Sequence, residues 1–167
     1  MNQFQTNIRK YEDSDRNTCM EIFLTNVPKY FTLEEVNEFD RFLAKLGDSE
    51  AIDNPIYYVL ELDNTIIGCG GFGEKEGIDG IPSITFVWGM VDSTYHKKGF
   101  GEELLRFRLA EIKVQFPEWK VILDTTQFSY SFFEKYGFKT LKITENSYGE
   151  GMHRYDMILE EDSKKFN

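Results

Sequence analysis

The sequence has little of several residue types, and each scarcity narrows the classes of protein to which it can belong. Its two cysteines, Cys19 and Cys69, lie far apart without metal-ligand spacing, so we expect two reduced, packed thiols and no metal site. No run of about 18 apolar residues is present, so we expect no membrane span. The first residues, 1–7, are polar and lack the apolar core of a signal peptide, which favours a cytoplasmic location.

Positive charge is also scarce. The chain has 19 Lys and Arg against 29 Asp and Glu, for a formal net charge of −10. Nucleic acids and acidic membranes are polyanions, so this balance argues against both as partners. The exception is a basic cluster at His96, Lys97 and Lys98, which stands out within an acidic chain. A solvated loop with chance lysines is the alternative interpretation.

The length of 167 residues fits one domain, and a hydrophobic share of 41% is enough for a core. We expect a single domain over 1–167, with 160–167 as a frayed polar tail and loops at 48–55, 74–82 and 145–151. The expected strands are 8–11, 57–62, 65–69, 83–91, 121–123, 138–144 and 152–159. Asp63 and Asn64 predict a hairpin turn, and the apolar run 121–123 predicts a buried parallel strand. The expected helices follow Asp13, Thr32, Gly101 and Gln127, and Gly47 suits the C-terminal cap of the second.

The chain is organised around residues 91–102. An apolar strand pattern enters this stretch, and a helical pattern leaves it and stops at Pro117. Between them lie two glycines, Gly99 and Gly101, beside the basic cluster. Glycine lets the backbone approach a ligand closely, and the first turn of a helix offers free N–H groups. Strand, glycine loop and helix start together predict a site for phosphate or another anion.

A second glycine-rich segment, Gly68–Gly73, matches the Gly-x-Gly-x-x-Gly dinucleotide pattern. That pattern binds a nucleotide only when it opens a helix, whereas the residues that follow, 74–82, read as a loop. We therefore reject a nucleotide site here. The glycines instead indicate a bulged or bent strand, or a surface that a ligand approaches.

Two segments carry a resemblance to a known family. Residues 96–101, His-Lys-Lys-Gly-Phe-Gly, resemble the Gln/Arg-x-x-Gly-x-Gly/Ala loop of the GNAT superfamily of acyl-CoA-dependent N-acetyltransferases, with His96 where that family has Gln or Arg. Residues 127–138 resemble its second signature, a helix that ends in aromatic-Glu-Lys-x-Gly-Phe. The two segments occur in family order, separated by a helix and a buried strand, and the resemblance covers about 57–159.

The resemblance implies an α/β (mixed α+β) fold: a mixed, mostly antiparallel sheet of about six to seven strands with helices on both faces. It also implies acetyl-CoA as cosubstrate and no metal. In the family the loop holds the pyrophosphate of coenzyme A through backbone N–H groups. The implied cofactor-binding residues are Met90, Val91, Ser93, His96, Lys97, Lys98, Gly99, Phe100, Gly101, Glu102, Gln127 and Phe133.

For catalysis, the resemblance assigns polarisation of the thioester carbonyl to backbone N–H groups of the central strand, at Met90 and Val91. Many family members have a tyrosine acid at the position of Phe133, which cannot donate a proton. Tyr130 lies near that position without matching it and is a candidate for a substitute acid, with core or surface packing as the alternative. The expected strand 83–91 has no carboxylate, so the base is either ordered water or one of three acids near in sequence: Glu74, Asp92 and Asp124. His153 can act as the base only if the last strand brings it to the cleft.

The predicted function is transfer of an acetyl group from acetyl-CoA to a primary amine of a small cationic molecule or peptide. Aromatic and acidic residues at Tyr30, Phe31, Glu34 and Trp88 suit an ammonium group, although such aromatics also pack in cores and such carboxylates also face solvent. The alternative is a catalytically silent acyl-CoA-binding sensor or regulatory module. An interaction domain without a coenzyme A site is a third hypothesis, and a homodimer is compatible with the sequence.

Overall fold

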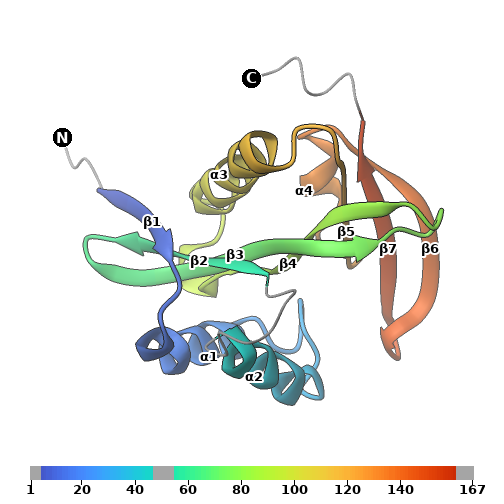
Figure 1. Ribbon diagram of the computed structural model, residues 1–167. Helices are drawn as coiled ribbons and strands as arrows, with labels where there is room; N and C mark the ends of the chain where they lie inside the picture. Colours follow the sequence, from blue (N-terminus) through green and yellow to red (C-terminus); the bar gives the residue numbers. More distant parts are fainter. Residues whose placement is uncertain (1–4, 47–54, 161–167) are drawn as a thin grey trace. The chain divides into compact units, whose positions relative to one another are not determined.

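A computed structural model describes residues 5–46 and 55–160, and their seven strands form a hydrogen-bonded sheet in the order β1-β2-β3-β4-β5-β7-β6 (Figure 1). Strand β4 pairs with β5 in parallel, whereas β1–β2, β2–β3, β5–β7 and β7–β6 are antiparallel. The mixed, mostly antiparallel sheet predicted from the sequence is therefore confirmed. The elements are β1 Thr6–Lys10, η1 Asp13–Asp15, α1 Arg16–Thr25, α2 Glu35–Leu46, β2 Ile56–Leu62, β3 Thr65–Glu76, β4 Pro82–Val91, η2 Ser93–Tyr95, α3 Phe100–Gln115, β5 Lys120–Thr125, α4 Tyr130–Glu134, β6 Phe138–Gly149 and β7 Met152–Leu159.

The chain divides into two compact units. The first comprises Met1–Gly73 and Val87–Pro117, and the second comprises Glu74–Phe86 and Glu118–Asn167. Strands β3 and β4 contribute residues to both. Each unit is described by itself below.

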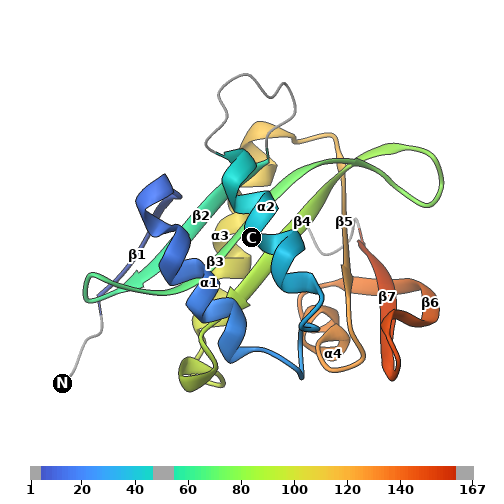
Figure 2. The same ribbon diagram turned by 90° about the horizontal axis from the view of Figure 1, so that it is seen from below.

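In the first unit, helices α1 and α2 cover one face of the strands and α3 covers the other (Figures 1 and 2). One core cluster joins α1 and α2 to the strands around Phe23, Phe39 and Val59, and a second lies beside α3 around Leu60 and Leu104. Cys19 and Cys69 are both fully buried free thiols in the first cluster. The helix α2 begins at Glu35, whose Oε1 accepts hydrogen bonds from the Thr32 N–H at 3.0 Å and from the Thr32 hydroxyl at 3.1 Å.

Strands β2 and β3 form the predicted hairpin. Asp63 and Asn64 have φ values of 48° and 69°, and two left-handed residues are what a two-residue hairpin turn needs. Within β3, a Cβ at Gly71 would lie 2.1 Å from the Ile56 carbonyl oxygen, so only glycine fits. The glycine-rich segment is thus part of a strand, as its rejection as a nucleotide motif required.

The second unit contains β5, α4, β6, β7 and the first half of β4. The parallel pairing joins Ser83, Ile84 and Thr85 of β4 to 120–122 of β5, which is the buried parallel strand predicted there. Helix α4 ends before Gly137, whose φ of 94° is the left-handed conformation of a helix C-terminal glycine. The aromatic rings of Phe133 and Phe138 then pack edge to face, 5.9 Å apart.

Two predicted loops were wrong in part. Residues 74–76 extend β3 although they are charged and exposed, and the turn closes with a 3.0 Å hydrogen bond from Gly77 N–H to the Ile81 carbonyl. Strand β6 continues to Gly149 past an irregularity after Thr144, where Asn146 has a φ of 55°. In both places the residues are polar, which favours a loop, but pairing with a neighbouring strand extends the β-structure through them. The expected features at Gly47, 48–54 and 161–167 lie outside the described residues.

The described part of the chain shows neither a metal-binding group nor a membrane-spanning helix. Across residues 5–46 and 55–160, no three His, Cys, Asp or Glu side chains are grouped so that they could hold a metal ion. The helices there are all too short or too polar to cross a membrane.

Candidate functional site

The segment between β4 and α3 forms a loop with two left-handed residues. Asp92 starts it by capping the short helix η2, with its Oδ1 accepting from the Thr94 N–H at 2.9 Å. Lys97 then has a φ of 62° and Gly99 a φ of 89°. Turns of this kind can point successive backbone N–H groups to one side, an arrangement that binds anions.

Gly99 is the N-cap of the 16-residue helix α3 and, as a glycine, provides no side-chain cap for its N-terminus. The first N–H groups of a helix have no partner within the helix, and the helix dipole makes this end positive. A Cβ built at Gly99 would meet no atom within 4 Å, so the space in front of the N-terminus is open. An open, uncapped helix start behind two lysines fits a pyrophosphate group, as coenzyme A would require.

The end of β4 is held in place by side chains from outside the loop. The Val91 carbonyl accepts hydrogen bonds from Asn26 Nδ2 at 3.0 Å and lies 2.8 Å from His96 Nε2. The Ser93 N–H donates to Thr25 Oγ1 at 3.0 Å. Asn26 is buried at the end of α1, so α1 braces both the strand end and the start of the loop. Thr25 and Asn26 were not predicted as site residues, because nothing in the local sequence pattern links α1 to a loop so distant in sequence.

Strand β4 is also bent just before its end. Trp88 has a φ of 41°, which is rare for a residue with a bulky side chain, and Gly89 follows it. Val87, Trp88 and Met90 all pack against the same core cluster, so the strict alternation of a strand is broken at this point. The bend therefore immediately precedes Met90 and Val91, the residues predicted to polarise a thioester.

A comparison of the sequence with models of known protein families gives a match that includes this loop. The profile described as Acetyltransferase (GNAT) domain matches residues 53–140, which is more than half of the chain. The chain belongs to the GNAT acetyltransferase family. The matched residues contain both segments on which the resemblance was based.

Solved structures show the same fold at low sequence identity. The ribosomal-protein-S18-alanine N-acetyltransferase from Escherichia coli is 16% identical with a TM-score of 0.72, covering 93% of each chain. Ard1 from Thermoplasma volcanium is 18% identical with a TM-score of 0.68, covering 93% of this chain and 99% of that one. Arabidopsis thaliana Naa50, in complex with the bisubstrate analogue CoA-Ac-MVNAL, is 13% identical with a TM-score of 0.66, covering 93% and 98%. The curated protein sequences contain no match.

The other residues of the loop differ in what their side chains contact. Lys98 Nζ lies 5.6 Å from the centroid of the Tyr95 ring. Phe100 is buried in the core cluster beside α3, which anchors the first turn of that helix. Glu102 Oε1 accepts from Arg106 Nε at 2.9 Å, one helical turn on. The loop thus presents Lys97, Lys98 and its backbone outward, while Phe100 holds it to the core.

The residues predicted to bind the acceptor divide into two groups. Phe31 and Trp88 pack against the core, with Phe31 stacked on Phe23 at 4.8 Å between centroids. Tyr30 is half-buried and meets the His96 ring edge to face at 5.5 Å, next to the candidate anion loop. Glu34 is exposed. Of the four residues, Tyr30 and Glu34 are therefore the ones with side chains placed to meet a ligand.

Three predicted residues lie in the second unit and make contacts there. The Gln127 amide donates to the Gly151 carbonyl at 2.7 Å and accepts from the His153 N–H at 2.9 Å. Tyr130 stacks on Tyr155 with 4.4 Å between ring centroids. Phe133 packs edge to face with its aromatic neighbours. These contacts give Gln127 and Tyr130 a role in holding β7 and the turn that precedes it.

The possible catalytic bases are partnered in different ways. Asp92 caps η2, as described above, and Glu74 is exposed at the end of β3. The Asp124 carboxylate accepts a hydrogen bond from the Tyr148 hydroxyl and lies 3.7 Å from Arg154 Nη2. His153 Nδ1 accepts from the Asn146 N–H at 3.0 Å, so it braces the turn between β6 and β7.

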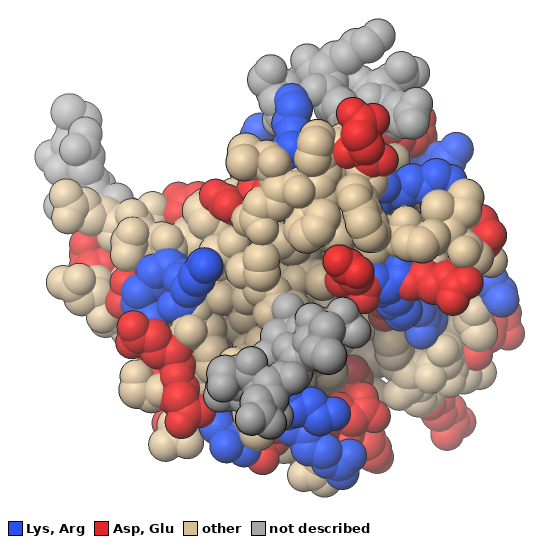
Figure 3. Space-filling view, viewed as in Figure 1, with Lys and Arg blue, Asp and Glu red and all other residues tan. Residues whose placement is uncertain are grey.

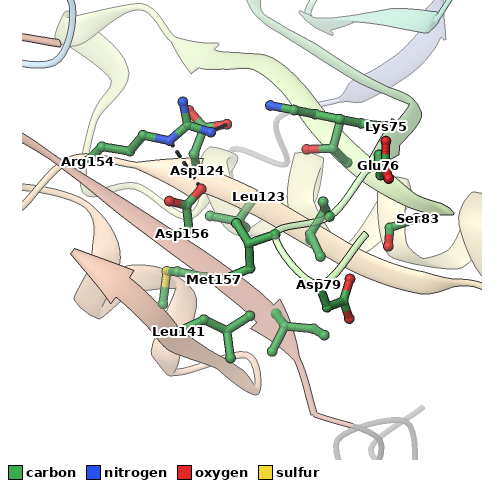
Figure 4. A pocket seen from close by; sticks show the side chains of 15 residues that line it. Lys75, Glu76, Asp79, Ser83, Leu123, Asp124, Leu141, Arg154, Asp156 and Met157 are labelled. Atoms are coloured by element: carbon green, nitrogen blue, oxygen red, sulfur yellow. Dashed lines mark hydrogen bonds and ion pairs between the residues drawn. The ribbon is translucent and has the colours of Figure 1, made fainter. Parts of the chain in front are cut away.

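Asp124 also lines a groove in the second unit (Figure 4). Asp124, Arg154 and Asp156 lie together at one end, with 3.1 Å between Arg154 Nε and Asp156 Oδ1, and Leu141 and Met157 line its apolar part. The charges at that end neutralise each other in part. The groove is a mainly apolar surface with a paired ionic rim.

Proposed function

We propose that the protein transfers an acetyl group from acetyl-CoA to a primary amine. The observation that carries this proposal is the open, uncapped N-terminus of α3 behind Gly99, directly after the bent end of β4. Membership of the GNAT acetyltransferase family supports the choice of acetyl-CoA over other phosphate compounds.

The backbone N–H groups of residues 98–101 would hold the pyrophosphate, with the ammonium groups of Lys97 and Lys98 adding positive charge. Such a cradle uses backbone groups, so His96 in place of Gln or Arg is compatible with it. His96 instead serves the loop internally, through its contact with the Val91 carbonyl.

In the reaction, the amine nitrogen attacks the thioester carbonyl carbon, a C–N bond forms and the C–S bond breaks. The coenzyme A thiolate leaves and takes up a proton, and the amine loses one. Negative charge develops on the carbonyl oxygen, which backbone N–H groups of Met90 and Val91 would stabilise. We propose that water removes the amine proton, because the carboxylates nearest in sequence are exposed or already hydrogen-bonded.

The proposed acceptor is a small cationic molecule or the amine of a peptide. The net charge of −10 attracts cations over long distances. Tyr30 and Glu34 would supply an aromatic face and a carboxylate for the approaching ammonium group. The amine has to lose its proton before it attacks, so binding selects the cation and catalysis uses the neutral form.

The test is isothermal calorimetry with acetyl-CoA on Gly99→Asp. The substitution adds a negative charge in front of the α3 N-terminus, and we expect affinity to fall by more than about tenfold, or about 1.4 kcal/mol. The matched control is Gly151→Asp, because Gly151 also has a left-handed φ, of 78°, and also has no atom within 4 Å of a Cβ. Equal losses in the two variants, or no loss in Gly99→Asp, would rule out the loop as the coenzyme A site.

A second candidate function is a silent acyl-CoA-binding module. Phe133 in place of a tyrosine acid favours it, as do the hydrogen bonds that engage Asp92 and Asp124. Both functions require acetyl-CoA binding, so release of free thiol in the presence of a panel of amines separates them. Binding without thiol release from any amine would favour the silent module.

A further inference from the structure

The bend in β4 is held by the Tyr57 hydroxyl. Tyr57 belongs to β2 and is 3% exposed, and its hydroxyl donates a 2.7 Å hydrogen bond to the Trp88 carbonyl. Trp88 is the residue with the left-handed φ of 41°. A conformation of this kind persists only where its surroundings fix it, and the bond from Tyr57 falls on the strained residue itself.

Glycine allows Tyr57 to reach across the sheet. Tyr57 pairs with Gly71 of β3, and β3 separates β2 from β4 in the strand order. A Cβ at Gly71 would lie 2.8 Å from Tyr57 Cδ1, so the tyrosine ring occupies the space that a side chain on β3 would fill. The glycine-rich segment thus provides the path along which a residue of β2 bonds to β4.

A buried arginine contacts the bend from the α3 side. Arg108 of α3 is 4% exposed, and its Nη1 lies 3.4 Å from the Gly71 carbonyl oxygen, to which it donates. A Cβ at Gly89 would lie 2.9 Å from both Nη1 and Nη2 of Arg108, so the guanidinium packs directly on the bent backbone. Burial lowers the pKa of Arg108 to about 10, which still leaves it charged near neutral pH. In sequence, Arg108 appears as a cation within the apolar face of α3.

We propose that Tyr57 and Arg108 are positioning residues that hold β4 bent at Trp88 and Gly89, and so aim the backbone N–H groups that follow at the acyl carbonyl. The proposal rests on the proposed function, because it concerns the carbonyl of bound acetyl-CoA. Neither residue needs to touch the substrate. Tyr57 bonds to Trp88, the residue of β4 with a positive φ, and Arg108 packs on the neighbouring Gly89.

The experiment is infrared difference spectroscopy of acetyl-CoA with an isotope-labelled acetyl carbonyl, bound to the full chain. Hydrogen bonds to a carbonyl oxygen lower its stretching frequency, so the wild type should show a shift relative to free acetyl-CoA. We expect Tyr57→Phe to lose roughly half of that shift or more, with the acetyl-CoA Kd changed by less than about threefold. Arg108→Lys, which keeps the charge but loses the planar fork, should lose part of the shift in the same way.

Two variants serve as controls. Tyr58→Phe removes the hydroxyl of the residue that follows Tyr57. Tyr58 is buried like Tyr57, but its ring packs on Phe72 and Phe107 and not on the bend. Arg41→Lys makes the same exchange at an exposed arginine of α2. Both should keep the full shift and the wild-type Kd.

The outcomes separate the two proposals. If the wild type does not bind acetyl-CoA, the proposed function fails and the inference fails with it. If the wild type binds but shows no carbonyl shift, or if Tyr57→Phe keeps the full shift, the positioning role is wrong while coenzyme A binding stands. A loss of affinity above about tenfold in Tyr57→Phe would also overturn it, because Tyr57 would then support the fold or the binding loop in general.

Discussion

At the scale of single residues, Asp15 shows how a charge is kept in a nearly buried place. Asp15 is 5% exposed, and both carboxylate oxygens accept from the Arg9 guanidinium, at 2.8 and 2.9 Å. The Glu12 N–H donates a third bond at 2.8 Å. The bonds from Arg9 hold the pKa of Asp15 below its ordinary value. The ionised carboxylate therefore ties β1 to the turn that precedes α1.

We expect Asp15→Asn to destabilise the fold by about 1.5–3 kcal/mol near pH 7, the range for hydrogen bonds to charged groups. Because the folded pKa is lowered, this contribution is complete above the ordinary aspartate pKa of about 3.9 and is lost as the pH falls through the folded value. Urea unfolding of both proteins at several pH values measures it. The gap between wild type and variant should narrow below about pH 4.

The control for this prediction is Asp79→Asn. Asp79 also has a lowered pKa, mainly through a bond from the Ile81 N–H, but its ion pair with Lys120 is on the surface. Exposed ion pairs contribute little to stability because water and salt screen them, so the control should have a small effect. Equal destabilisation by the two substitutions would contradict the assignment of stability to the buried pair.

At the scale of elements, the join between β4 and α3 depends on bonds that the loop makes to the strand it leaves. His96 closes the loop on the Val91 carbonyl, and Asn26 of α1 shares that carbonyl. The loop's shape is thus set by α1 and β4 as well as by its own glycines. His96, which stands where the GNAT loop pattern has Gln or Arg, therefore helps to set the shape of the loop.

We expect His96→Ala to weaken acetyl-CoA binding by about three- to tenfold, because the loop loses its contact with the Val91 carbonyl of β4 and has to be ordered on binding. His96→Gln should stay within about twofold, because its amide N–H can donate to the same carbonyl. Calorimetry on both variants makes the comparison. If the two substitutions weaken binding equally, the contact with Val91 has no part in shaping the loop.

The elements themselves were largely predictable because their signals are local. The helical spacing before Pro117, the turn at Asp63 and Asn64, and the apolar run at 121–123 all led to the observed α3, hairpin and parallel strand. The ends of β3 and β6 were not, since strand pairing extends them through polar residues. Pairing depends on a partner strand that a local pattern does not contain.

At the scale of the whole molecule, the candidate site was predictable where it is one continuous segment. Residues 96–101 carry their own signal of glycines, charge and a helix start. Asn26, Tyr57 and Arg108 lie far from that segment in sequence and contact the strand end that precedes it, at Val91, Trp88 and Gly89, and only the fold brings them there. Arg108 is partly recognisable from the sequence, because it lies within the apolar face of a helix and a buried arginine is rare without a partner.

The charge of the molecule is also a whole-molecule property. On the face shown in Figure 3, acidic and basic side chains are interspersed in small groups. The formal net charge of −10 belongs to the whole chain and acts at long range. A long-range field attracts cationic molecules from solution without selecting among them. We propose that selection among amines depends on local contacts, such as those of Tyr30 and Glu34.

This field leads to a prediction about the acceptor. With acetyl-CoA saturating, kcat/KM for a cationic amine should fall by about three- to tenfold as salt rises from about 0.02 to 0.5 M, because screening weakens the attraction. The fall should be largest for a diamine, smaller for a monoamine and absent for an amino acid, whose carboxylate cancels the charge. At fixed salt, kcat/KM should rise with pH towards the amine's own pKa, about 10 for an alkylamine, because only the neutral amine attacks. Thiol release measures all three acceptors. A preference for the amino acid, or the same salt dependence for all three, would contradict an acceptor site that favours cations.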